Sequence, residues 1–126
     1  MTVERYEFAR HYGDFTRSYH KHVPTVVGPE FLPKIGFVKP GVAMGFLYQT
    51  DSAVCHIEAL VANPNVSGAE RTKGIDEVVM AIADEARKLG FKAMQGSTSL
   101  PAIVERAKRL GFVHDPEPSW FVTLML

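Results

Sequence analysis

The spacing of apolar residues predicts an antiparallel sheet in the first half of the chain. Three apolar or alternating runs, at 34–38, 42–49 and 53–62, are separated by the turn-forming segments KPG and TDS. Short runs of this kind with turn residues between them are typical of strands joined in a meander. We therefore expect three consecutive antiparallel strands.

From residue 75 the apolar period changes to three or four residues and persists as far as Leu89. This period predicts a helix, and Gly90 directly after it is a typical helix end. The segment FKAMQGS at 91–97 then predicts a short strand. Because a helix between two strands usually makes them parallel neighbours, we expect EALVA, at 58–62, to lie beside FKAMQG.

The last part of the chain predicts a second helix at 99–111, with Ser99 as its N-cap and Gly111 at its end. The apolar segment SWFVTLML, at 119–126, predicts a closing strand that is long enough to pair across a homodimer.

The first 33 residues have a different texture. Residues 3–22 are rich in aromatic side chains and predict one or two short helices broken at Gly13, and the prolines and glycine between 24 and 33 predict an irregular connection. No amino-terminal strand is evident. Nothing in the composition divides the chain, so we expect one domain over residues 1–126.

Charge and cysteine content narrow the function classes. The 126 residues contain 14 Lys and Arg against 14 Asp and Glu, so no global field attracts nucleic acid. The single Cys55 excludes an internal disulfide, and no apolar stretch has the length of a membrane span. The charged amino terminus is unlike a signal peptide. We expect a cytoplasmic protein that binds neither membrane nor nucleic acid.

Three segments carry a resemblance to a known family. They are EALVANP at 58–64, RTKGID at 71–76, and the two helix endings ARKLGFK and AKRLGFV. In this order of elements, residues 34–126 resemble the GNAT superfamily of acyl-CoA-dependent N-acyltransferases. The resemblance implies an α/β (α+β) fold with a mixed, mainly antiparallel sheet flanked by helices, in the order β-meander then β-α-β-α-β.

The same resemblance implies a function and a set of binding residues. It implies transfer of an acyl group from an acyl-CoA, most plausibly acetyl-CoA as co-substrate, to an amine acceptor that is a small molecule or a protein. A glycine beside a helix start lets backbone N–H groups approach a diphosphate, and Arg and Lys side chains add charge-assisted hydrogen bonds. The implied cofactor-binding residues are Leu60, Val61 and Ala62 at the acyl carbonyl, with Arg71, Thr72, Lys73, Gly74 and Ile75 at the diphosphate and Ser97 near the thiol.

Strand alternation supplies the candidate catalytic pair. It places His56, Glu58, Leu60 and Ala62 on one face of the strand, and Cys55, Ile57, Ala59 and Val61 on the other. By the resemblance Glu58 is the general base, and His56 beside it could accept a proton near neutral pH. The alternative is that Glu58 pairs with a surface lysine and that His56 is a hydrogen-bonded polar side chain.

Several features favour a second function. Asp76 and Ala107 stand where the family pattern has a small residue and a tyrosine, and Arg71 lies further past Pro64 than in that pattern. Ser67 and Glu70 also match a capping box, so the segment could be a helix start only. The alternative is a catalytically inactive GNAT-fold binding or assembly module.

A metal site at His11, His20 and His22 is less plausible than a surface cluster, because no acidic or cysteine ligand accompanies them.

Overall fold

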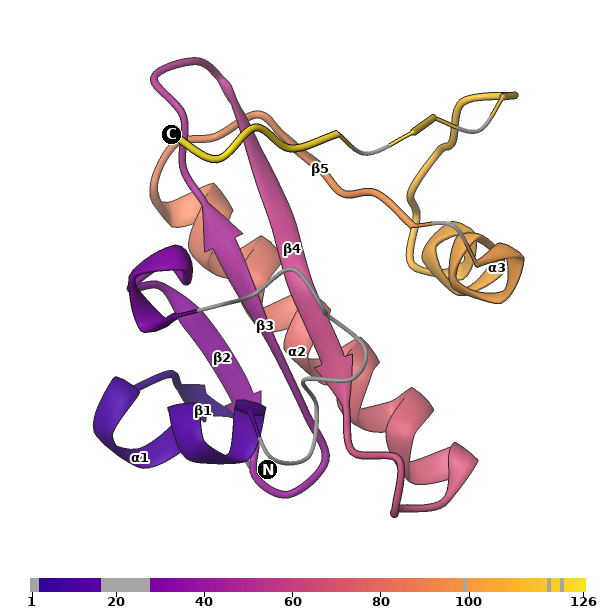
Figure 1. Ribbon diagram of the computed structural model, residues 1–126. Helices are drawn as coiled ribbons and strands as arrows, with labels where there is room; N and C mark the ends of the chain where they lie inside the picture. The colour runs from indigo at the N-terminus through magenta and orange to yellow at the C-terminus, as the bar shows by residue number, and fades with distance from the viewer. Residues whose placement is uncertain (1–2, 17–27, 99, 118, 121) are drawn as a thin grey trace. The chain divides into compact units, whose positions relative to one another are not determined.

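The computed structural model describes residues 3–16, 28–98, 100–117, 119–120 and 122–126. The chain forms two compact units, Met1–Gly96 and Ser97–Leu126, and each is described by itself (Figure 1). No described helix has both the length and the apolar character needed to cross a membrane.

The first unit contains a five-stranded sheet in the order β1-β2-β3-β4-β5. The predicted meander is confirmed, because neighbouring strands from β1 to β4 are antiparallel, and β5 is parallel to β4. β1 was not predicted, since two residues are too few to show a period. The strands are β1 (Glu4–Arg5), β2 (Gly36–Lys39), β3 (Ala43–Tyr48), β4 (Val54–Ala62) and β5 (Ala93–Gln95).

The parallel pair is confirmed, but its register differs from the prediction. β5 pairs with Val54–His56 and not with residues 58–62. The chain that follows the crossover helix is held at the amino-terminal end of β4. There the backbone N–H groups of Lys92 and Ala93 both donate to the Ala53 carbonyl, at 2.8 and 3.3 Å. A strand of three residues that begins there cannot reach the far half of β4.

The crossover helix, α2 (Gly68–Lys88), begins seven residues before the predicted apolar stripe. Its start is fixed by Ser67, whose side-chain oxygen accepts a hydrogen bond from the Glu70 N–H at 3.1 Å. This is one half of the predicted capping box. Gly90 adopts φ +91° and follows the helix end as expected.

The amino-terminal helix, α1 (Phe8–Asp14), passes through Gly13, so the predicted break there is wrong. The helix is held at its start by His11, whose Nδ1 accepts the Glu7 N–H at 2.8 Å. Residues 17–22 of the predicted helical segment lie outside the described residues. A short 3₁₀ helix, η3 (Pro29–Phe31), leads into β2.

The sheet has two buried faces with different side chains. We call the side covered by α2 the α2 face and the opposite side, which carries α1 and η3, the α1 face (Figure 1). The α2 face is aliphatic and packs Ala43, Leu47 and Ile57 toward Val78 and Ile82. The core of the α1 face is Tyr6, Phe15, Leu32, Val38, Met44, Phe46 and Val61.

The second unit contains α3 (Pro101–Arg109), followed by Gly111 at φ +97°. Leu100 occupies the cap position, and the predicted cap Ser99 lies outside the described residues. The predicted closing strand is wrong for residues 119–120 and 122–126, which form no strand. A strand forms only when its backbone groups find a partner, and within this unit the described residues include no other strand.

Candidate functional site

The main irregularity of the sheet is a bulge in β4. Met44 pairs with Val61 and Phe46 pairs with Glu58, so one β3 residue between these pairs faces two residues of β4. One of the two, Ala59, has φ +54°, the only positive φ among the described residues other than glycine. Such a bulge leaves one residue out of the hydrogen-bonded ladder and turns the strand locally.

The bulge changes which residues share a face. His56 and Glu58 pair with Tyr48 and Phe46 on the α1 face, as their predicted common face requires. Leu60 and Ala62 do not join them, because the extra residue reverses the alternation. Leu60 lies on the α2 face, and Val61 takes its place in the α1-face core at 2% exposure.

A glycine in β3 makes room for the displaced leucine. A Cβ atom at Gly45 would lie 2.8 Å from Leu60 Cδ1 and 3.2 Å from Ile82 Cδ1. A side chain at this position would therefore push against the bulge and α2 together. The bulge was not predicted, although a glycine inside an apolar strand is a signal of close approach by a neighbouring chain segment.

A second feature of the bulged strand is its change of partner along its length. β4 pairs with β5 only from Val54 to His56, because β5 ends at Gln95, and its pairing with β3 begins at His56. Beyond this point β4 continues to Ala62 with β3 on one side, and within the first unit the described residues provide no strand on the other. The bulge lies in this second half of β4.

Three polar side chains meet on the α1 face beside the bulge. Glu58 and His56 are half-buried on β4, and Tyr48 lies directly across from His56. The Tyr48 hydroxyl donates to the Phe31 carbonyl at 3.2 Å, which fixes η3 against β3. Burial raises the pKa of Tyr48, and the Glu58 carboxylate raises it further. The phenol therefore keeps its proton to a higher pH than an ordinary tyrosine.

The helix start brings Arg71 to the loop that precedes it. Its Nη1 donates to the carbonyls of Pro64 and Val66, so the side chain curls back over the first turn. A Cβ at Gly68 would lie 3.7 Å from the other terminal nitrogen of Arg71. Its positive charge therefore lies beside the positive end of the helix dipole, where an anion would be attracted.

The other residues of the predicted diphosphate motif lie inside α2. Thr72 is half-buried, Lys73 is exposed and Ile75 is buried in the core. Gly74 is buried against the turn after β2, and a Cβ there would lie 2.5 Å from Val42 Cγ1. This glycine permits close packing of the helix on the sheet.

Asp76 is the acid expected to disturb the motif, and it directly follows Ile75 inside α2. Its Oδ1 is buried without a hydrogen-bond partner. Its neighbour Glu77 accepts a hydrogen bond from Lys39 Nζ at 3.1 Å. Ser97 is the first residue of the second unit.

Metal binding has no support in the described residues, which contain no group of three or more His, Cys, Asp or Glu side chains placed to hold an ion. His11 is instead buried, and its Nε2 lies 2.9 Å from Glu4 Oε1. His20 and His22 lie outside the described residues.

The fold is that of GNAT-type acetyltransferases. A putative acetyltransferase from Agrobacterium tumefaciens has a TM-score of 0.70 at 15% identity, with 98% of this chain and 100% of that chain covered. An acetyltransferase from Trypanosoma brucei has a TM-score of 0.67 at 17% identity, with 97% and 98% covered. Glucosamine-6-phosphate N-acetyltransferase from Arabidopsis thaliana has a TM-score of 0.65 at 14% identity, with 97% and 98% covered. No family model matches the chain, and no curated protein matches its sequence.

Proposed function

We propose that the protein is an N-acyltransferase that moves an acetyl group from acetyl-CoA to a primary amine. The observation that carries this proposal is the bulge at Ala59 in the half of β4 that has no β5 neighbour. A bulge presents backbone N–H groups away from the ladder, and such groups can hold the oxygen of a thioester carbonyl as negative charge develops on it. We assign this role to the backbone from Ala59 to Ala62, which includes the predicted residues Leu60 and Val61.

The donor diphosphate is proposed to lie at the start of α2. The N–H groups of Gly68 and Ala69 have no acceptor within the helix, whereas those of Glu70 and Arg71 donate to Ser67. The Arg71 guanidinium lies beside them and adds positive charge. Lys73, exposed two residues further on, would add a second cation, and Thr72, Gly74 and Ile75 would support the turn from inside the helix.

Glu58 is proposed as the general base. The attacking nitrogen must lose a proton as its bond to the carbonyl carbon forms and the carbon–sulfur bond breaks. Glu58 is half-buried on the α1 face next to the bulge, within the electrostatic reach of Tyr48. His56, two residues earlier on the same face, would pass the proton toward solvent, and Ser97 stays a candidate for contact with the leaving thiol.

The second candidate is a binding or assembly module that has the fold without the catalysis. It is favoured by the position of Gly74, because a glycine enclosed by Val42 inside a helix has a packing role that requires no cofactor.

The test is calorimetric titration of acetyl-CoA and CoA into the purified protein at low and moderate salt. Micromolar binding that salt weakens would support the acyltransferase, and no binding at millimolar ligand would favour the module. Arg71→Ala should weaken binding by about tenfold, the equivalent of about 1.4 kcal/mol. Arg87→Ala is the matched control, because Arg87 lies at the other end of α2 and pairs with Asp84 at 2.9 Å.

A homodimer is proposed to involve the carboxy-terminal segment. Trp120 and Leu124 are 96% and 81% exposed, an unusual state for large apolar side chains. Paired with the same segment of a second copy, they would bury this surface. Light scattering of the wild type and of Leu124→Lys tests this, since a dimer held by the segment should become monomeric in the variant.

A further inference from the structure

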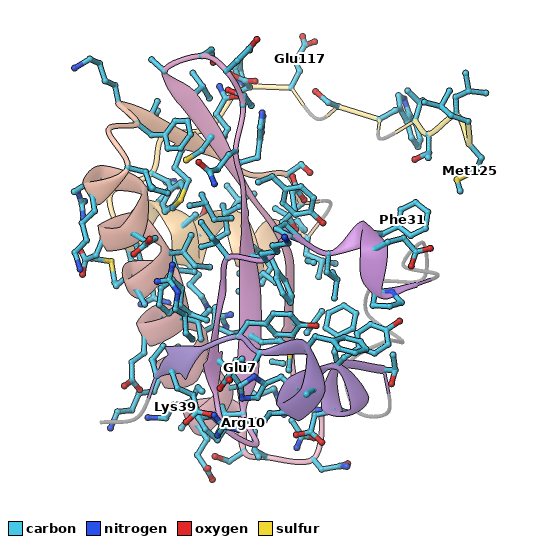
Figure 2. All side chains as sticks on the ribbon, turned by 90° about the vertical axis from the view of Figure 1, so that its left-hand side faces the viewer. Glu7, Arg10, Phe31, Lys39, Glu117 and Met125 are labelled. Atoms are coloured by element: carbon cyan, nitrogen blue, oxygen red, sulfur yellow. The ribbon has the colours of Figure 1, made fainter. Side chains whose placement is uncertain are left out.

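An open groove on the α1 face is lined mainly by apolar side chains. Its volume is about 490 Å³, which lies within the usual range for ligand pockets. Its apolar wall consists of Tyr6 from the segment before α1, Phe8 from α1, and Pro29, Leu32 and Pro33 from η3 and the chain after it. Figure 2 shows η3, marked by Phe31, on the same side of the sheet as α1, where Glu7 and Arg10 are labelled.

The groove is linked to Glu58 through Phe46. The Tyr6 ring meets the Phe46 ring edge-on at 4.7 Å between centroids, and Phe46 is the cross-strand partner of Glu58. Since cross-strand side chains start about 5 Å apart, the groove wall lies on the order of 10 Å from Glu58. The Tyr48 hydroxyl also donates a hydrogen bond to the Phe31 carbonyl and so connects η3 to β3. Tyr48 is close enough to Glu58 for the carboxylate to raise its pKa.

The charges at the rim favour one class of occupant. Glu30 and Lys34 are the two charged residues that line the groove, one of each sign. The Glu30 carboxylate folds over Gly28, where a Cβ would lie 2.5 Å from its Oε1. Recognition of a phosphate usually requires several positive or N–H donors that converge. A single lysine beside a glutamate is a poor phosphate site, whereas rings, prolines and a leucine suit an apolar body.

We propose that this groove holds the non-reacting part of the acceptor, and that the acceptor is a primary amine on a small aromatic or branched apolar body without phosphate. This inference rests on the proposed acyl transfer. The apolar body would occupy the wall of Tyr6, Phe8 and Leu32, and the amine would extend toward Glu58. Glu58 takes a proton from the nitrogen as it bonds to the thioester carbon, and CoA leaves with the sulfur electron pair.

The experiment compares amines at fixed acetyl-CoA by the release of free thiol. The probes are phenethylamine, spermidine and an amino sugar phosphate. Burial of a phenyl ring is worth about 2 kcal/mol, so phenethylamine should have a kcat/KM roughly 10- to 100-fold above those of the two polar amines. A preference for spermidine or for the amino sugar phosphate would overturn the inference and leave the acyltransferase proposal intact.

Two variants locate the binding site. Phe8→Ala removes a groove side chain that is 58% exposed and should raise the KM for phenethylamine roughly 3- to 10-fold, with little change in kcat. Phe31→Ala is the matched control, because Phe31 is 44% exposed and does not line the groove, and its carbonyl is retained for Tyr48. Equal effects of the two variants would contradict the assignment.

A direct titration of phenethylamine into the protein without donor separates this inference from the proposed function. Binding that Phe8→Ala weakens and Phe31→Ala does not would support the groove even if acetyl-CoA fails to bind. The absence of both phenethylamine binding and turnover would overturn the groove. If only acetyl-CoA fails to bind, the acyltransferase proposal is overturned, whereas the assignment of the groove as a binding site for the amine is not.

Discussion

The two faces of the sheet bury side chains of different chemistry. On the α2 face, Val78 and Ile82 are fully buried against aliphatic strand residues, and the ion pair of Lys39 with Glu77 lies at its margin. On the α1 face, aromatic rings predominate, and His56 and Glu58 lie on the strand among them. The same five strands therefore carry an aliphatic layer on one side and a mixed aromatic and polar layer on the other.

The difference separates stability from chemistry. An aliphatic layer gains from close packing and tolerates no polar group without a partner. The α1 face includes side chains that need hydrogen bonds, such as Tyr48 and His11, and it contains the groove. Substitutions on the two faces should consequently have different effects. Those on the α1 face should lower the reaction rate, and those on the α2 face should lower the free energy of unfolding.

The largest effect is expected from Glu58→Gln. Loss of a general base typically slows a reaction by about 100- to 10,000-fold, so kcat/KM in the thiol-release assay should fall within that range while the thermal midpoint changes little. Glu77→Gln is the control on the other face, where loss of a partly exposed pair costs about 1 kcal/mol or less. A Glu58→Gln enzyme that matches wild type at every pH would remove this carboxylate from the mechanism.

On the α2 face, Ile82→Ala should lower the stability of the fold and leave the reaction unchanged. The side chain is fully buried, so truncation should lower the free energy of unfolding by about 2 to 5 kcal/mol in urea titration. The KM for the acceptor should stay the same in the folded fraction. Met80→Ala, on the same helix but 42% exposed, should cost far less. A large change of KM in Ile82→Ala would show that the faces are coupled.

Gly74→Ala tests whether that glycine serves packing or cofactor. The added methyl group would meet Val42, so we expect a loss of about 1 to 3 kcal/mol in stability, relieved when Val42→Ala is added. The acetyl-CoA affinity of the folded protein should not change. If affinity falls and Val42→Ala fails to restore it, Gly74 contacts the cofactor directly.

The sequence predicted the elements whose signal is local and repeated. The strands around 34–38, 42–49 and 53–62 and the helix ending at Gly90 were predicted because period and turn residues reflect burial and backbone geometry directly. The start of α2 was placed late, since residues 68–74 are exposed or polar for most of their length and carry no apolar stripe. Only the Ser67 cap marked it.

The site was less predictable because it depends on one irregular residue. Ala59 at positive φ has no sequence signature, and it reverses the faces of every residue after it in β4. Leu60 and Val61 were therefore assigned to the wrong faces, while His56 and Glu58, before the bulge, were assigned correctly. The groove combines Tyr6 with Leu32 across a connection whose path no pattern predicts.

The smallest effect concerns the alkaline limit of stability and again distinguishes the two faces. Burial raises the pKa of Tyr48 and of Tyr6, both on the α1 face, above the ordinary 10.0. In the folded state these phenols keep their protons at a pH where the unfolded chain loses them. Their contribution is complete below about pH 10 and is lost as pH rises through the folded pKa.

Tyr48→Phe should make stability fall less steeply above pH 10 in urea titrations at stepped pH. The change in slope should be well below the limit of about 1.4 kcal/mol per pH unit for a single group, because solvent reaches part of the ring. Glu58→Gln should reduce the Tyr48 contribution without abolishing it, since burial is the larger cause of the raised pKa. An alkaline slope that is the same in wild type and Tyr48→Phe would mean that Tyr48 ionises as readily in the folded protein as in the unfolded chain, and would remove the electrostatic link between Glu58 and the wall of the groove.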